Sequence, residues 1–163
     1  HKVRIMSDVR FVLTVRRGAF VKRRTDGSVD YVSPLPCPFD YGEVPGTMAA
    51  DGDALDVVVW GALPADAVGP GDDYALALQG AVDFYDDGVV DTKLIVGDTA
   101  PGASGRVAIL AFFRLLALAK SLRGMVRQRG GGRSRVVGWL DATAATERLR
   151  SAQASANIDG SRS

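Results

Sequence analysis

The stretch Asp51-Gly52-Asp53-Ala54-Leu55-Asp56 leads directly into the apolar run Val57-Val58-Val59-Trp60. It sets three carboxylates within six positions at the start of a strand rich in β-branched residues. Carboxylates this close repel one another unless something positive lies between them. Hard oxygen donors of this kind suit Mg²⁺ or Mn²⁺, although an acidic loop that simply faces water fits the stretch alone equally well.

A second pair of carboxylates, Asp86 and Asp91, flanks an Asp-Gly dipeptide that favours a tight turn. A two-residue turn there pairs Asp86 with Val89 and Phe84 with Asp91. Because side chains alternate between the faces of a strand, Asp86, Asp91 and Lys93 are expected on one face. Either Lys93 forms a structural ion pair with these carboxylates, or the carboxylates hold a metal while Lys93 meets a negative substrate.

The order of predicted elements indicates an α+β fold, a β-barrel or curved sheet with flanking helices. Strands come first and helices last. A polar tail, about 155–163, is expected to be mobile. The expected strands are 10–15, a hairpin of 19–24 with 29–33, 55–60, and a hairpin of 74–86 with 89–96; the expected helices are 106–122 and 142–152.

Composition places the chain among ordinary globular proteins and excludes several chemistries. Its 163 residues are 47% hydrophobic and 24% charged, which predicts one domain over 1–163. His1 is the only histidine and Cys37 the only cysteine, so a Ser-His-Asp triad, a Cys-His pair and a zinc site are excluded. One cysteine, no membrane-length apolar run and no signal-peptide pattern together favour a cytoplasmic protein.

Charge is distributed unevenly behind a net value of +1. Basic residues gather in 16–24 and 120–135, and most aspartates lie between 51 and 91. This arrangement suits a site that binds metal cations and anionic oxygens together. The basic segments lack interleaved aromatic residues, so no nucleic-acid partner is expected.

Several motifs together resemble the family I soluble inorganic pyrophosphatases over about 10–150. They are Pro38-Phe39-Asp40-Tyr41-Gly42, the Asp-Gly-Asp-x-x-Asp run of 51–56, Asp86 to Asp91 followed by Lys93, and Gly138-Trp139 before an Ala-rich helix. The resemblance implies a small closed OB-like barrel, mostly antiparallel, and Mg²⁺-dependent hydrolysis of pyrophosphate, with Mn²⁺ as a possible substitute. It also implies a homo-oligomer, hexameric if bacterial.

The resemblance also implies a role for each site residue. Asp51, Asp56 and Asp91 are expected to ligate a tightly held metal pair, and Asp86 with Asp91 a metal carried by the substrate. Asp53 is expected to take a proton from the attacking water, as general base catalysis requires. The expected substrate contacts are Lys22, Tyr41 and Lys93.

This chain departs from the family pattern mainly around the phosphate-binding residues. Thr14 and Arg24 stand where glutamates are usual, and Tyr31 replaces an arginine. Arg24 could restore the charge that Tyr31 lacks, or it could be a solvated arginine. A late Tyr-Lys pair has no clear match, with Arg127 as the nearest candidate. The altered residues leave open another phosphoanhydride substrate, such as a nucleotide or polyphosphate, or a binding protein without turnover.

Overall fold

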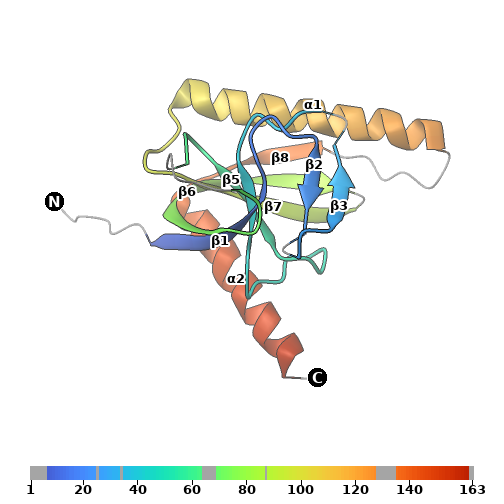
Figure 1. Cartoon of the computed structure of the whole chain (residues 1–163). Coiled ribbons are helices and arrows are strands. Elements are labelled where there is room, and N and C mark those ends of the chain that lie inside the picture. Colours follow the sequence, from blue (N-terminus) through green and yellow to red (C-terminus); the bar gives the residue numbers. More distant parts are fainter. Residues whose placement is uncertain are drawn as a thin grey trace.

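The computed structural model describes residues 7–24, 26–33, 35–63, 69–86, 88–127 and 135–161 (Figure 1). Eight strands and two helices lie within these ranges. They are β1 (Asp8–Val15), β2 (Val21–Arg23), β3 (Val29–Val32), β4 (Tyr41–Val44), β5 (Leu55–Val59), β6 (Asp73–Asp86), β7 (Val89–Val96), α1 (Ala103–Arg127), β8 (Arg135–Leu140) and α2 (Ala142–Gly160).

Five of the strands form a closed barrel. The sheet runs in the order β1-β4-β5-β7-β6, and pairing of β1 with β6 closes it, while β8 extends the other half of β6. All pairs are antiparallel except β5 with β7. Strands β2 and β3 form a separate hairpin beside the barrel (Figure 1). The expected α+β fold with a closed, mostly antiparallel OB-like barrel is confirmed.

The alternation of side chains in β5 divides the molecule into an interior and a site-bearing exterior. Leu55, Val57 and Val59 belong to the cluster that fills the barrel, together with residues of α2. Val58 instead packs in a second cluster, between the barrel and α1. Asp56 alternates with the interior residues, so it lies on the outer face, toward α1.

The two helices cover different parts of the barrel (Figure 1). Ile109, Phe113 and Ala117 of α1 are buried in the outer cluster. Helix α2 starts at the cap residue Asp141, whose Oδ1 accepts a hydrogen bond from the Ala144 amide at 2.8 Å. Neither described helix combines the length and apolarity that a bilayer crossing requires.

Both helices are longer than expected. α1 was predicted over 106–122 and runs over Ala103–Arg127, and α2 was predicted to end near 152 and runs to Gly160. The prediction of a tail from about 155 is therefore wrong as far as Gly160. Ala152, Ala154 and Ala156 favour helix. Ser155 is compatible with the helix because its Oγ donates back to the Ser151 carbonyl at 3.0 Å.

The sequence pattern missed β4 and β8. β4 is short, follows three prolines and contains Gly42. A Cβ at Gly42 would lie 2.5 Å from the Val12 carbonyl oxygen, so only glycine lets β1 approach β4 this closely. β4 matters for function because Tyr41 and Glu43 both point outward from it, on the same side as Asp56.

Candidate active site

A tight turn presents Asp51 and Asp53 at the entrance to β5. Gly52 has φ of 86°, a left-handed conformation that glycine adopts without strain. Asp51 Oδ1 accepts a hydrogen bond from the Asp53 amide at 3.0 Å. Thr47 Oγ1 accepts one from the Leu55 amide at 3.0 Å and donates to the Val44 carbonyl at 2.6 Å. These contacts fix the turn relative to the strand that follows it.

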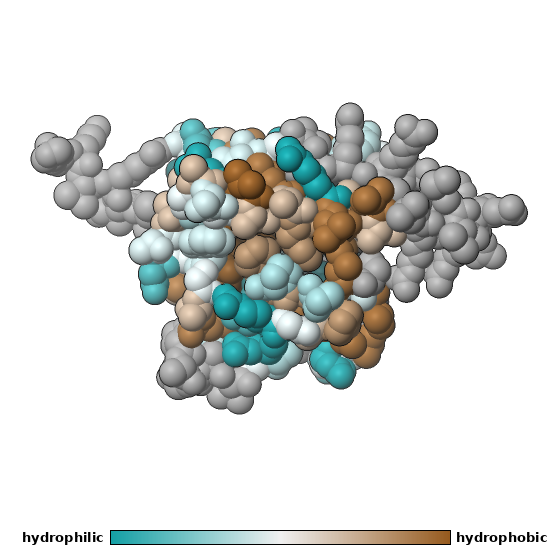
Figure 2. Space-filling view, turned by 90° about the horizontal axis from the view of Figure 1, so that it is seen from above, coloured by the Kyte–Doolittle hydropathy of each residue, from teal (hydrophilic) through white to brown (hydrophobic). Residues whose placement is uncertain are grey.

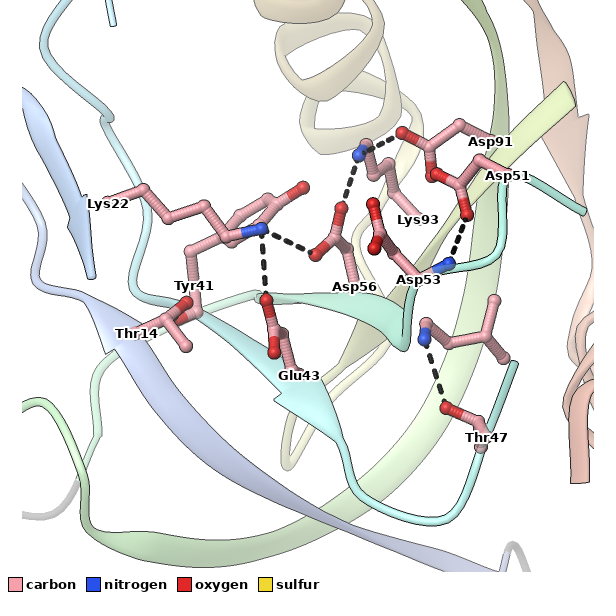
Figure 3. Close-up of polar contacts among 11 residues, drawn as sticks. Thr14, Lys22, Tyr41, Glu43, Thr47, Asp51, Asp53, Asp56, Asp91 and Lys93 are labelled. Carbon is pink, nitrogen blue, oxygen red and sulfur yellow. Dashed lines mark hydrogen bonds and ion pairs between the residues drawn. The ribbon is translucent and has the colours of Figure 1, made fainter. Parts of the chain in front are cut away.

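Lys93 joins Asp56 to Asp91 on the outer face of the barrel (Figure 3). Parallel pairing places Asp56 of β5 directly beside Lys93 of β7. The Lys93 Nζ lies 2.5 Å from Asp56 Oδ2 and 2.5 Å from Asp91 Oδ2. The predicted hairpin register, with Phe84 opposite Asp91, is confirmed. In this structure, Lys93 forms the ion pairs that the sequence offered as one of two readings.

Lys22 approaches the same carboxylate from the separate hairpin. Its Nζ lies 3.1 Å from Asp56 Oδ1 and 3.1 Å from Glu43 Oε1. The ring of Tyr41 lies near both lysines, with its centroid 5.6 Å from Lys22 Nζ and 5.7 Å from Lys93 Nζ. Asp56 is thus held between two ammonium groups, each close to an aromatic face.

The protonation states at this site follow from burial and from charge. Burial alone would lower the pKa of Lys93, but Asp56, Tyr41 and Asp91 raise it well above the usual value. Burial opposes ionisation of Asp56, yet Lys93 and Lys22 lower its pKa. Burial, with Asp56 nearby, raises the pKa of Asp91 despite Lys93. Burial and Asp56 raise the pKa of Tyr41 well above its usual value, so its hydroxyl keeps its proton at neutral pH.

All of these groups line one cavity of about 660 Å³. We call Asp51, Asp53, Asp56 and Asp91 the acidic cluster. The remaining polar lining comes from Lys22, Arg24, Ser33, Tyr41, Glu43 and Lys93. Figure 3 shows the acidic cluster and Lys93 turned toward a common space.

The donor chemistry of the acidic cluster fits a divalent cation, since Mg²⁺ prefers carboxylate oxygens and retained waters. Asp51 and Asp53 are exposed, and Asp56 and Asp91 already share a positive group in Lys93. Within the described ranges, no three carboxylate, histidine or cysteine side chains are already gathered as a metal site. The carboxylates of the acidic cluster therefore suit a metal ion. In this structure, Lys93 supplies the positive charge between Asp56 and Asp91.

Most of the predicted site residues come together in the structure. Asp51, Asp53, Asp56, Asp91, Lys22, Tyr41, Lys93 and Arg24 all line the cavity. The side chains of Asp86, Tyr31 and Arg127 lie outside the described part of the chain, so the prediction of Asp86 as a metal ligand remains a prediction.

Sequence reasoning missed Glu43 and the α1 residues that face the cavity. The Glu43 position follows from alternation with Tyr41, but β4 itself was not recognised. From α1, the described lining side chains are Phe112, Phe113 and Leu116. Arg127 lies eleven residues beyond Leu116, about 16 Å further along the helix axis. The helix segment over this site is therefore the one around Leu116.

The fold and the site define a β-barrel protein whose outer face carries carboxylates bridged by lysines. The sequence profile of the inorganic pyrophosphatase family matches residues 16–109. The chain belongs to that family. Its aligned region is 30% identical over 95 residues to the inorganic pyrophosphatase of Aquifex pyrophilus, covering 54% of this chain and 52% of that protein.

Further relatives agree with this assignment. The inorganic pyrophosphatase of Gluconobacter oxydans (strain 621H) is 33% identical over 96 residues, which is 55% of this chain and 54% of that protein. The chain thus spans about half the length of the curated relatives it matches. The crystal structure of the inorganic pyrophosphatase from Thermus thermophilus superposes with a TM-score of 0.75 at 26% identity, covering 94% of each chain.

Proposed function

We propose that this protein hydrolyses inorganic pyrophosphate to two phosphates in a reaction that requires Mg²⁺. The observation that carries the proposal is the convergence of the acidic cluster with Lys22, Lys93 and Tyr41 in one cavity. Carboxylates alone would repel pyrophosphate, and lysines alone would not activate water. The two together suit phosphoanhydride hydrolysis, and membership of the inorganic pyrophosphatase family supports this reading.

In this proposal Asp51, Asp56 and Asp91, with Asp86, would hold the metal ions. Bound Mg²⁺ supplies charge neutralisation and a lowered pKa for coordinated water. Mn²⁺ offers a similar preference for oxygen ligands and is a possible substitute.

The chain's own residues then carry the proton and the charge. Asp53 lies at the exposed rim of the turn, where its amide donates to Asp51 Oδ1, and its carboxylate accepts the proton of the attacking water. Lys22 and Lys93 have raised pKa values, so both bring full positive charge to the phosphate oxygens at neutral pH. Tyr41 keeps its proton and donates a hydrogen bond. Arg24, on the same cavity, adds a forked donor for phosphate.

The family resemblance also supports proposals about domain organisation, assembly and location. We propose that residues 1–163 form a single domain that assembles as a homo-oligomer, a hexamer if the source is bacterial. We place the protein in the cytoplasm, with no nucleic-acid or membrane partner.

The test is phosphate release across a panel of substrates at saturating Mg²⁺. The panel contains pyrophosphate, a nucleoside triphosphate and polyphosphate. We expect pyrophosphate to give the highest kcat/KM among these three inorganic and nucleotide substrates. If only the triphosphate or polyphosphate is hydrolysed, the proposed substrate is wrong. If pyrophosphate binds but is not hydrolysed, the protein is a binding protein and not an enzyme.

A further inference from the structure

Half of the cavity is apolar. We call its side chains Phe20, Cys37, Phe84, Phe112, Phe113 and Leu116 the apolar wall. They come from four places: Phe20 from the residue before β2, Cys37 from the connection before β4, Phe84 from β6, and the other three from α1. The α1 side chains described along this wall contribute no charge and no hydroxyl to the cavity.

The apolar wall is continuous with the phosphate-binding groups. Phe84 is the register partner of Asp91, and its ring lies 6.0 Å from that of Phe113. The Phe113 ring lies 5.3 Å from that of Phe112. Phe20 precedes Lys22 by two residues and is half exposed. Phe84 and Phe113 are each only 1% exposed and support the wall from behind. A ligand held by Lys22 and Lys93 therefore meets the partly exposed side chains of Cys37, Phe112 and Leu116.

Hydrophobic residues also reach the outside of the molecule in this region. Figure 2, seen from the α1 side, shows hydrophobic side chains gathered on this face between hydrophilic ones. Phe20 of the hairpin approach is 51% exposed. Phe20, which also lines the cavity, therefore offers an exposed apolar surface at its edge.

An inorganic ligand would not be complementary to the apolar wall. Pyrophosphate presents charged oxygens at both ends, and charged oxygens against apolar carbon lose hydration without a new partner. A cavity of about 660 Å³ falls among those that hold organic ligands of roughly drug size. An aromatic or alkyl group would instead gain from contact with Phe112 and Leu116.

We propose that the cavity accepts organic monoesters of diphosphate, in which the diphosphate lies at the lysines and the acidic cluster while an aromatic or alkyl substituent packs on the apolar wall. This inference rests on the proposed function, because it uses the same hydrolytic site. Water attacks the terminal phosphorus and the anhydride P–O bond breaks. The products are inorganic phosphate and the organic monophosphate, with the water's proton passing to Asp53. No other reactant is needed.

The first test compares kcat/KM for phenyl diphosphate and for inorganic pyrophosphate in three proteins at saturating Mg²⁺. They are the unaltered chain, Leu116→Lys, and the control Leu115→Lys. Leu115 lies on the same helix, is 52% exposed and does not line the cavity. We expect the unaltered chain to prefer phenyl diphosphate, and Leu116→Lys to shift the ratio about tenfold or more toward pyrophosphate. Leu115→Lys should leave the ratio unchanged.

A second measurement reads binding without turnover. Isothermal titration calorimetry with Mg²⁺ compares methylenediphosphonate with its phenyl monoester. We expect the phenyl ester to bind about tenfold more tightly to the unaltered chain, with that advantage lost in Leu116→Lys and kept in Leu115→Lys. Equal binding of the two analogues would overturn the inference.

These outcomes separate the two proposals. Hydrolysis of pyrophosphate with no preference for the phenyl ester, in turnover and in binding, overturns the apolar-substituent inference and leaves the proposed function standing. Absence of turnover on both substrates overturns the proposed function, and calorimetry then still decides what the apolar wall binds.

Discussion

The acidic cluster and the apolar wall face each other across one cavity, yet the fold builds them differently. The acidic cluster stands on or beside strands of the closed barrel, where register fixes each side chain against its neighbour. Most of the apolar wall comes from α1 and from the approach to the β2–β3 hairpin, outside the barrel. Residues outside the barrel can change without disturbing its hydrogen-bond ladder. The two sides of the cavity are therefore free to change independently of each other.

The largest effect is expected from Asp56→Asn. Asp56 is buried and contacts both Lys22 and Lys93, so its charge organises the whole polar side of the cavity. We expect kcat/KM for pyrophosphate to fall at least about 1,000-fold, roughly 4 kcal/mol of transition-state stabilisation. Steady-state phosphate release measures the loss.

Asparagine is the appropriate substitution at this position. Alanine would open a gap between Lys22 and Lys93, which would then keep only Glu43 and Asp91 as their respective carboxylate partners. Asparagine keeps the size of the side chain and one oxygen acceptor for the lysines. The thermal midpoint from circular dichroism controls for folding. A folded Asp56→Asn protein with full activity would show that the carboxylate has no part in catalysis.

Asp53→Asn should give the next largest effect and a different signature. The amide keeps one oxygen ligand but cannot accept a proton, so we expect kcat to fall about 100-fold. The Mg²⁺ concentration for half-maximal activity should change little. If Mg²⁺ affinity falls as much as kcat, Asp53 acts as a metal ligand and the general base lies elsewhere.

Arg24→Glu tests the charge at the edge of the hairpin. Arg24 lines the cavity, and we expect its reversal to raise KM for pyrophosphate about tenfold, or about 1.4 kcal/mol. Arg23→Glu is the matched control, because Arg23 is exposed, donates to the Gly27 carbonyl at 3.0 Å and does not line the cavity. Equal changes in the two variants would assign the effect to overall charge.

The smallest effect is expected from Glu43→Gln, and it should depend on pH. Burial lowers the pKa of Lys22, but Asp56 and Glu43 raise it above its usual 10.5 while Lys93 opposes them. A raised lysine pKa stabilises the fold below the unfolded value, and this is lost as pH rises through the folded value. We expect Glu43→Gln to cost about 1 kcal/mol of unfolding free energy at pH 7. The cost should be smaller at a pH above the usual lysine value of 10.5, where Lys22 begins to lose its charge. Urea denaturation at pH 7 and at a pH above that lysine value measures the cost of the substitution. A cost that stays constant with pH would argue against the ion pair between Lys22 and Glu43.

The sequence predicted the acidic cluster well because its information is local. Asp51, Asp53 and Asp56 lie within six residues, and the Asp91–Lys93 spacing follows from strand alternation. Glu43 was missed since its strand is short and interrupted by Gly42, whose role depends on the distant Val12 carbonyl. Leu116 was missed because a helical apolar stripe looks the same whether it covers a core or lines a cavity. Those positions depend on tertiary packing.

Phosphate release from inorganic pyrophosphate, measured while Mg²⁺ is titrated from chelated to saturating concentrations, tests the central claim most directly. The arrangement of carboxylates and lysines predicts negligible release in chelator and a rise with Mg²⁺ to two phosphates per pyrophosphate consumed. Release that is insensitive to Mg²⁺, or no release at any Mg²⁺ concentration from a folded protein, would contradict the claim.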